Sequence, residues 1–333
     1  MAINQSILLF ICLFFLVSSN VSVAEKRGLQ WQGPANAIST PYLQGNYRAV
    51  IIGNSTYQDK KGVWRSLKTP GNDADVLASV LHQDYGFADV TVLKDAGRRD
   101  ILLALNALSA RVEPNDNVLV YYAGHGHLNE ETKRGYWIPV DAEGDDSSTF
   151  IRNSTIRDEI NIIAEKTKHT LLVSDSCFSG SLLRGGNRAA KKTEKTNPYF
   201  IKVSNKKSVQ ILAAGGIEYV DDNYKDSGHS PFSYFLINEL RNNSDNLLTM
   251  SELAQNVIRA VANNVEQMPQ AGVLQGAGDE LGEFIFARVS LRDETMEIYA
   301  GSIPVDTDNK QNTGKIDDTE REPTILRVPL PRF

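Results

Sequence analysis

Two reactive side chains, an imidazole and a thiol, each follow an apolar run that ends in glycine-containing sequence. His125 lies in Val118-Leu-Val-Tyr-Tyr-Ala-Gly-His-Gly-His127, and Cys177 lies in Thr170-Leu-Leu-Val-Ser-Asp-Ser-Cys-Phe-Ser-Gly180. Each apolar run predicts a buried strand with the reactive residue just beyond its end. A thiol attacks as a thiolate, and a neighbouring imidazole can remove its proton. The two segments therefore predict a cysteine hydrolase.

The same segments supply backbone donors for the oxyanion that forms when a thiolate attacks a carbonyl. Gly126 follows the imidazole and has no side chain to block a substrate, and Cys177 has a backbone N–H of its own. We expect His125 to take the thiol proton and return it to the leaving amine. A zinc site of His125, His127 and Cys177 is the alternative, but the sequence indicates no fourth ligand.

Strands alternate with helices along most of the chain. Apolar patterns predict strands at 47–53, 89–93, 117–123, 136–138, 170–174, 208–213 and 283–287, and helices at 72–82, 99–112, 158–166, 231–241 and 250–265. Asn72 is the expected cap of the first helix, with Asp73 in its first turn. This order predicts a three-layer α/β fold, in which helices cover both faces of a mainly parallel sheet. The carboxyl ends of neighbouring strands then meet at one crevice, where His125 and Cys177 would come together.

The first 24 residues resemble a secretory signal peptide. Ile7 to Val17 is an unbroken apolar run, too short to cross a bilayer comfortably, and the small residues Ser22 and Ala24 precede the expected cut. We therefore expect a secreted or periplasmic protein with no later membrane span. An uncleaved N-terminal membrane anchor is the alternative, and no Lys or Arg precedes the apolar run.

Charge and cysteine content narrow the function further. The 333-residue chain has a formal net charge of −6, which argues against a nucleic-acid-binding surface. One of its two cysteines, Cys12, lies in the signal segment, so the mature chain keeps Cys177 alone and forms no internal disulfide. An inert core cysteine is the alternative to a nucleophile. The polar, glycine-containing surroundings of Cys177 favour the nucleophile.

We divide the chain into four parts. Residues 1–24 are the signal peptide, 25–46 a polar extended lead-in, 47–288 one folded domain, and 289–333 a polar tail that we expect to be disordered. Within the domain, 184–207 is rich in Lys, Arg, Gly and Asn and predicts an exposed, mobile loop.

The two reactive segments resemble a known family. Tyr-Ala-Gly-His125-Gly and Asp-Ser-Cys177-Phe-Ser-Gly are similar to the two signatures of caspase-like cysteine peptidases, in particular of their bacterial and metacaspase branch. The resemblance extends over roughly 47–287 and includes Leu67-Lys-Thr-Pro-Gly-Asn-Asp-Ala74. It implies the caspase–haemoglobinase fold and a cysteine endopeptidase with His125 and Cys177 as the catalytic dyad. One departure is Phe178, because metacaspases usually have His after the nucleophile.

The resemblance also implies a substrate preference. In metacaspase-like members, the Asp two residues before the Cys and the Asp of the Asn-Asp-Ala element line the S1 pocket; here these are Asp175 and Asp73. They would bind Arg or Lys at P1, and a carboxylate beside the nucleophile can pair with a guanidinium. The alternatives are a helix-start carboxylate for Asp73 and a loop-forming one for Asp175.

Calcium dependence and self-processing have weaker signals. Some metacaspases need calcium, and Asp141, Asp158 and Glu159 fall near matching positions, with a solvated acidic loop as the alternative. We expect no other cofactor. If P1 is basic, 184–207 offers candidate self-cleavage points at Arg184, Arg188, Lys191, Lys192 and Lys195. The alternative is that this segment is only an exposed loop.

Two other functions stay open at this point. The first is a non-catalytic caspase-like scaffold, although the presence of both dyad residues counts against it. The second is a different cysteine hydrolase, such as an amidase, which would share the dyad and differ in pocket shape. As an endopeptidase, the protein would take proteins or peptides as its partners.

Overall fold

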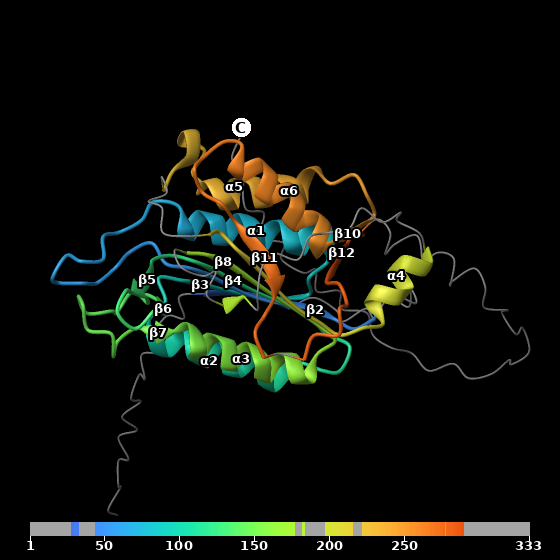
Figure 1. The fold of residues 1–333 in the computed structure, drawn as a ribbon, viewed down its shortest axis with the longest axis horizontal. Coiled ribbons are helices and arrows are strands. Elements are labelled where there is room, and N and C mark those ends of the chain that lie inside the picture. Colours follow the sequence, from blue (N-terminus) through green and yellow to red (C-terminus); the bar gives the residue numbers. More distant parts are fainter. Residues whose placement is uncertain are drawn as a thin grey trace, which may run out of the picture.

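A seven-stranded sheet forms the centre of the molecule (Figure 1). The computed structural model describes residues 28–32, 44–176, 182–183, 197–215, 222–276 and 278–289. The sheet has the order β1-β3-β2-β4-β8-β9-β11. Its strands are β1 (Gly28–Gln32), β2 (Tyr47–Gly53), β3 (Asp89–Lys94), β4 (Asn117–Ala123), β8 (His169–Asp175), β9 (Ser208–Ala213) and β11 (Gln270–Val273).

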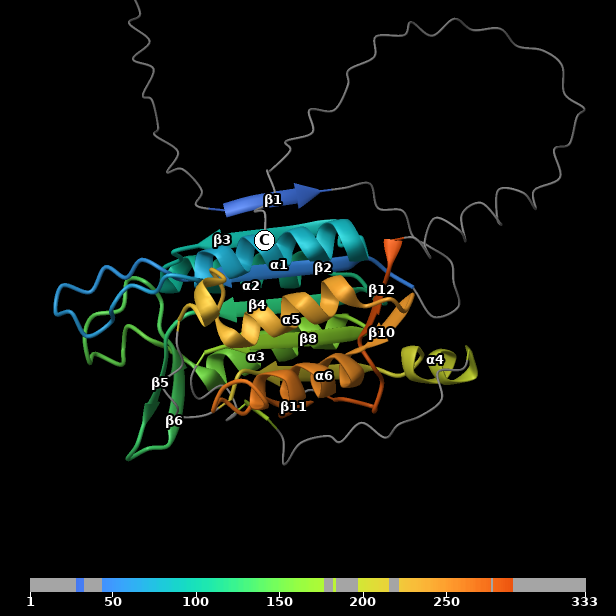
Figure 2. The same cartoon turned by 90° about the horizontal axis from the view of Figure 1, so that it is seen from above.

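The inner strands of the sheet are parallel, and both edge strands are antiparallel (Figure 2). Strand β2 pairs with β3 and β4, β4 pairs with β8, and β8 pairs with β9, all in parallel. The predicted mainly parallel sheet is therefore confirmed. The lead-in predicted as extended chain contributes β1, which pairs with β3 and covers that edge of the sheet.

Helices cover both faces of the sheet and complete the three layers. One face carries α1 (Pro70–Tyr85), α5 (Pro231–Asn242) and α6 (Met250–Ala262), and the other carries α2 (Arg98–Arg111) and α3 (Asn153–Lys166). Successive side chains of a strand point to opposite faces. Thus Tyr121 of β4 packs in the core beneath α1 and α5, whereas Tyr122 packs in the core beside α2 and α3.

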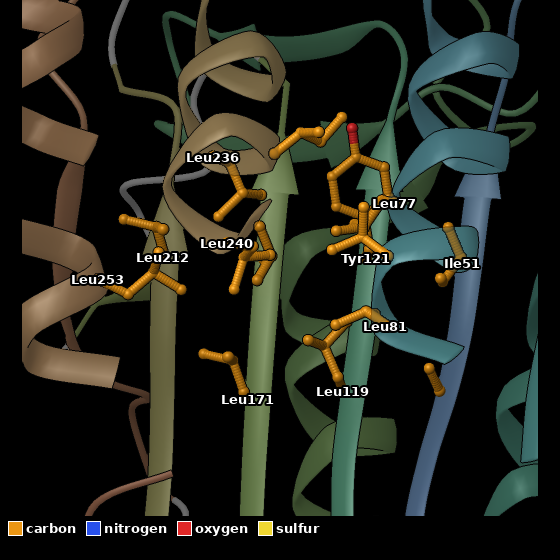
Figure 3. Close-up of a cluster of buried hydrophobic side chains, with 14 of the residues drawn as sticks. Ile51, Leu77, Leu81, Leu119, Tyr121, Leu171, Leu212, Leu236, Leu240 and Leu253 are labelled. Atoms are coloured by element: carbon orange, nitrogen blue, oxygen red, sulfur yellow. The ribbon is translucent and has the colours of Figure 1, made fainter. Parts of the chain in front are cut away.

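Aliphatic side chains fill the layer beneath α1 and α5 (Figure 3). Leu77 and Leu81 of α1 and Leu236 and Leu240 of α5 lie over the strands, and Tyr121 lies among them with its hydroxyl toward the carboxyl ends of the strands. This hydrophobic layer holds the two helices against the sheet, so that the first turn of each helix lies at that same end.

Helix α1 begins two residues earlier than predicted. Its N-cap is Thr69 and its first residue is Pro70, so Asn72 lies inside the helix rather than capping it. A proline is favourable at this position because its missing N–H would have no helical partner. The helix start packs closely on β2: a Cβ atom added to Gly53 would lie 2.2 Å from the Pro70 carbonyl oxygen. This contact brings Asp73, in the first turn, to the end of the sheet.

Two small sheets complete the described fold. An antiparallel sheet of β5 (Gly126–Asn129), β6 (Arg134–Trp137) and β7 (Ile151–Arg152) extends beyond β4. The strand predicted at 283–287 does not join the main sheet; it forms β12 (Ile285–Ala287) and pairs with β10 (Leu247–Thr249). A short 3₁₀ helix, η2 (Tyr224–Asp226), precedes α5.

Part of the predicted mobile loop at 184–207 is helical. Helix α4 (Asn197–Ser204) buries Phe200 and Val203 against Leu247 and Ile285. The spacing of three residues places both side chains on one helical face, which the basic composition of the segment concealed. Residues 184–196, the signal segment and 290–333 lie outside the described residues. Within the described part, no helix is both long enough and apolar enough to cross a bilayer.

Candidate active site

The two predicted reactive segments follow adjacent strands. Strands β4 and β8 are paired in parallel with Ala123 opposite Asp175. His125 follows Ala123 by two residues, and Cys177 follows Asp175 by two. The Gly124 N–H donates to the Asp175 carbonyl oxygen at 3.3 Å, so the pairing reaches the residue before the imidazole. The prediction that the two strands are neighbours is confirmed, whereas Cys177 itself lies outside the described residues.

The backbone of His125 is held by two buried tyrosines. Its N–H donates to the Tyr57 hydroxyl at 2.8 Å, and its carbonyl oxygen accepts from the Tyr122 hydroxyl at 2.9 Å. These hydroxyls explain why the residue before His125 is a glycine. A Cβ atom on Gly124 would lie 2.8 Å from the Tyr122 oxygen and 2.9 Å from the Tyr57 oxygen. The tyrosines thus set where the imidazole leaves the strand.

The imidazole is oriented by a backbone carbonyl. His125 Nε2 lies 2.7 Å from the Arg65 carbonyl oxygen. A carbonyl can only accept, so we assign the proton to Nε2, which leaves the lone pair of the neutral ring on Nδ1. Burial lowers the pKa of His125, and the Arg65 hydrogen bond and the charge of Asp222 partly offset this effect. The ring is therefore a neutral base with Nδ1 available to take a proton.

Trp64 and Asp59 hold the loop that supplies this carbonyl. Asp59 accepts from the backbone N–H groups of Val63 and Trp64 within the loop and of Gly144 outside it. The Trp64 Nε1–H donates to the Gly144 carbonyl oxygen at 2.8 Å, and the indole lies 5.6 Å from the His125 ring. The loop is thus tied to the segment around Gly144. The tie is at Trp64, the residue before Arg65, whose carbonyl oxygen contacts the imidazole.

The two acidic residues predicted to line a pocket come together beside the end of β8. Ser230 links them: its hydroxyl donates to Asp175 Oδ2 at 2.5 Å, and its N–H donates to Asp73 Oδ2 at 3.4 Å. Ser233 donates a second hydroxyl hydrogen bond to Asp175 Oδ2 at 2.7 Å. Tyr121 lies 2.6 Å from the Ser233 hydroxyl and extends the network into the core. The first turns of α1 and α5 therefore converge on the last residue of β8.

Burial makes the two carboxyl groups of this acidic cluster, Asp73 and Asp175, bind protons more strongly. Burial, followed by the charge of Asp73, raises the pKa of Asp175 to about 7, although Ser230 and Ser233 act in the opposite direction. Burial also raises the pKa of Asp73 despite its hydrogen bond to His229. A cation placed beside the acidic cluster would favour ionisation of both carboxyl groups.

The sequence assigned no role to three residues beside these carboxyl groups. His229 lies in Gly-His-Ser-Pro-Phe, which the family resemblance places near the substrate cleft, and its side chain is buried with Nδ1 2.6 Å from Asp73 Oδ1. The sequence did not single out Ser230 or Ser233. Serine followed by proline at a helix start is a recognised capping pattern, and Ser230 is the N-cap of α5. That pattern could have located Ser230 at a helix terminus, but not at Asp175.

The remaining candidate residues have the following positions. Gly126 is the first residue of β5, opposite Trp137. Its role as an oxyanion donor stays a prediction, because the second expected donor, Cys177, lies outside the described residues. His127 packs against the rings of Trp64, Tyr136 and Phe150.

The three calcium candidates do not fit one ion. Asp141 Oδ1 accepts from the Arg98 N–H at the start of α2, and Asp158 in α3 pairs with Arg157. Glu159 follows Asp158 in α3, where burial, followed by the charge of Asp158, raises its pKa. In the part of the chain that the structure describes, no three His, Cys, Asp or Glu side chains are grouped so that they could hold a metal ion.

Comparison with known proteins identifies the family. A family model described as the caspase domain matches residues 46–273. This chain belongs to the caspase-domain family of cysteine peptidases. The match runs from the residue before β2 to the end of β11, so it includes β4 and β8, which precede His125 and Cys177, and the elements of the acidic cluster.

Metacaspases are among the similar curated proteins. Metacaspase-1A of Aspergillus niger is 30% identical over 161 residues, which cover 42% of this chain and 37% of that protein. Metacaspase-1 of Kluyveromyces lactis is 25% identical over 179 residues, covering 46% and 39%. The chain therefore spans less than half the length of these relatives.

Two solved structures resemble the fold. A protein of Geobacter sulfurreducens matches with a TM-score of 0.49 and 17% identity, covering 72% of this chain and 99% of that one. Caspase-1 of Spodoptera frugiperda matches with a TM-score of 0.46 and 15% identity, covering 69% and 89%.

We expect Trp64 to act as a positioning residue for His125, and the Trp64→Phe variant tests that expectation. Phenylalanine keeps a ring beside His125 but removes the hydrogen bond to Gly144, which is worth about 1 kcal/mol. We expect kcat for peptide hydrolysis to fall about fivefold, since about 1 kcal/mol is close to a fivefold change in rate.

The control is Val63→Ala in the same loop, because the Val63 side chain is 43% exposed and its backbone bond to Asp59 is retained. Steady-state kinetics of both variants at matched stability measure the effect. Equal kcat values for Trp64→Phe and the wild type would show that the Trp64 hydrogen bond does not help to position His125.

Proposed function

We propose that this protein is a cysteine endopeptidase that cleaves after Arg or Lys. Cys177 is the nucleophile, His125 is the general base and acid, and Asp73 and Asp175 bind the P1 side chain. The observation that carries the specificity is the pair of carboxyl groups beside the end of β8, of which Asp73 is buried and Asp175 half-buried, next to the strand that leads to His125. Family membership supports the hydrolysis of protein substrates.

The proposed reaction has two steps: the thiolate first forms a thioester with the substrate, and water then hydrolyses that thioester. His125 Nδ1 takes the thiol proton, and the thiolate attacks the P1 carbonyl carbon. Backbone N–H groups of Gly126 and Cys177 stabilise the oxyanion. His125 then donates the proton to the leaving amine, and a water molecule, deprotonated by the same ring, hydrolyses the thioester. The lowered pKa of His125 keeps the ring in its basic form at neutral pH.

The charge of the pocket supports a basic P1 residue. Among the described residues, neither Asp73 nor Asp175 forms an ion pair with a Lys or Arg, so no guanidinium or ammonium group of the protein competes with a basic ligand there. A planar guanidinium can donate to two carboxylates at once. An acidic P1 side chain would meet two carboxyl groups and be repelled.

A panel of peptide amides tests the proposal. Matched peptides ending in Arg, Lys or Asp before a fluorescent amine are incubated with the wild type and with Cys177→Ala in reducing buffer, with and without calcium. We expect the wild type to release the amine from the Arg and Lys peptides, and Cys177→Ala to release none. Turnover of the Asp peptide alone would contradict the specificity. No turnover of any peptide would favour the scaffold function.

Two further proposals concern residues 1–24 and 184–195, which lie outside the described residues. We expect 1–24 to direct export and to be removed. The candidate points for self-cleavage are Arg184, Arg188, Lys191, Lys192 and Lys195. Mass mapping of the same incubated samples locates any cut. Intact bands in both the wild type and Cys177→Ala would contradict self-processing under those conditions.

A further inference from the structure

The loop of residues 59–68, which orients His125, is held by a carboxylate at each end. At its start, Asp59 accepts from three backbone N–H groups of the loop itself. At its end, the Lys68 N–H donates to Asp222 Oδ2 at 2.9 Å, across 154 positions of the chain. Arg65, whose carbonyl oxygen lies 2.7 Å from His125 Nε2, is between these two ties. The segment that contains Asp222 therefore reaches the loop beside the residue that contacts the imidazole.

The Asp222 carboxylate carries more than its bond to Lys68 requires. Its second oxygen, Oδ1, is buried and has no hydrogen-bond partner among the described residues. A buried, unpartnered oxygen of this kind is costly, and its charge is poorly screened by water. That charge acts on the dyad: burial lowers the pKa of His125, and the Arg65 hydrogen bond and the charge of Asp222 oppose this effect.

We propose that Asp222 is a positioning residue of the dyad, which holds the loop that orients His125 and stabilises by its charge the imidazolium that His125 forms. This inference rests on the proposed function. When the thiol proton moves to His125 Nδ1, Cys177 becomes a thiolate and the ring becomes a cation. When the ring gives the proton to the leaving amine, it is neutral again. Asp222 neither gains nor loses a proton in either step.

The other groups around the imidazole do not supply this negative charge. The Tyr57 ring lies 4.7 Å from the His125 ring, but burial raises the pKa of Tyr57, so its hydroxyl stays neutral. Arg65 contributes its backbone carbonyl, and the His127 ring packs against other aromatic rings. Among the described carboxylates, the charge that acts on His125 is that of Asp222.

The first test replaces Asp222 with asparagine, which keeps an oxygen to accept from Lys68 but removes the charge. The carboxylate favours the protonated ring, so its loss should lower the pKa of His125. NMR titration of histidine labelled with ¹³C in the ring measures this pKa in the Cys177→Ala protein, with and without Asp222→Asn. A His125 pKa that is unchanged or higher in the double variant would overturn the inference.

The same substitution should weaken His125 as a base in the active enzyme. We expect kcat for the Arg peptide at pH 7.5 to fall about fivefold in Asp222→Asn, because a ring of lower pKa takes the thiol proton less readily. The acid limb of the kcat/KM profile should move to lower pH, since the ring then stays neutral in more acidic solution. A lower kcat with an unmoved acid limb would show a structural role only and would overturn the inference.

The Asp222→Ala variant separates the two parts of the role, because it removes the bond to Lys68 as well as the charge. We expect the same movement of the acid limb as in Asp222→Asn and a further loss of kcat of about tenfold, since a hydrogen bond to a charged group is lost. Equal kcat values for the two variants would overturn the assignment of the Lys68 bond to the positioning of His125.

The matched control is Asp226→Asn in the same segment. Asp226 is exposed and accepts from the Asn223 amide at 3.2 Å. We expect it to leave both the His125 pKa and kcat unchanged, and an equal effect in this variant would overturn the specific role of Asp222. A lowered His125 pKa in a protein that cleaves no peptide would support the charge effect and contradict the proposed function alone. An unchanged His125 pKa in an enzyme that cleaves Arg peptides would overturn the inference alone.

Discussion

We expect the His125→Gln enzyme to turn over Arg peptides about 10³-fold more slowly than the wild type. Glutamine can still donate a hydrogen bond to the Arg65 carbonyl, but it cannot take a proton from Cys177. Only a few per cent of an unassisted thiol is ionised near neutrality, and the leaving amine would lack a proton donor. The remaining activity should rise with pH as the thiol ionises without help.

The matched control is His127→Gln, two residues along the chain. His127 packs among aromatic rings, and we expect its replacement to change kcat less than about threefold. Steady-state kinetics of both variants between pH 6 and pH 9 make the comparison. Comparable losses in the two variants would indicate that both imidazoles act together, as in a shared metal site. Wild-type turnover by His125→Gln would exclude the proposed base.

The Asp175→Asn variant should lose recognition of basic P1 residues while gaining stability at neutral pH. Asparagine can still accept hydrogen bonds from Ser230 and Ser233, but it has no charge to pair with a guanidinium. Removing one member of a buried, hydrogen-bonded charge pair costs 2 kcal/mol or more in binding. We therefore expect kcat/KM for the Arg peptide to fall about 10²-fold.

The gain in stability follows from the raised pKa of Asp175. The carboxyl group has a pKa of about 7 in the folded state against an ordinary value of 3.8, so the folded protein binds this proton more tightly than the unfolded chain. Its contribution to stability therefore falls as pH rises from 3.8 to about 7. Asparagine removes that penalty. We expect Asp175→Asn to have a higher Tm than the wild type at pH 8 and an equal Tm near pH 3.5.

Asp75→Asn is the control for both measurements. Asp75 lies two residues after Asp73 on α1, but its side chain is 41% exposed and pairs with Lys94. We expect nearly unchanged kinetics and a Tm difference that varies little with pH, because an exposed pair of this kind contributes little to stability. An Asp175→Asn enzyme that cleaves Arg peptides normally would show that this carboxyl group does not bind P1.

Local sequence patterns were sufficient to predict the layers of this fold. The apolar runs of β4 and β8 identify buried strands, and the residues beyond their ends identify an imidazole and a thiol. Alternation of strands and helices predicts the parallel sheet, and in such a sheet the two strand ends share one edge. The elements that the sequence did not predict lie in segments whose structure depends on a distant partner. Strand β1 needs the free edge of β3, and α4 needs the apolar surface around Leu247.

The acidic cluster shows the limit of sequence reasoning more clearly. Asp73 and Asp175 were singled out by family resemblance, whereas their surroundings came from the tertiary structure. Asp73 meets His229 across 156 positions of the chain, and Asp175 meets Ser230 across 55. Hydrophobic periodicity is a local property that a strand or helix displays on its own. The pKa of a carboxyl group depends on burial and on the charges across the site, which exist only after α1, α5 and β8 have packed together.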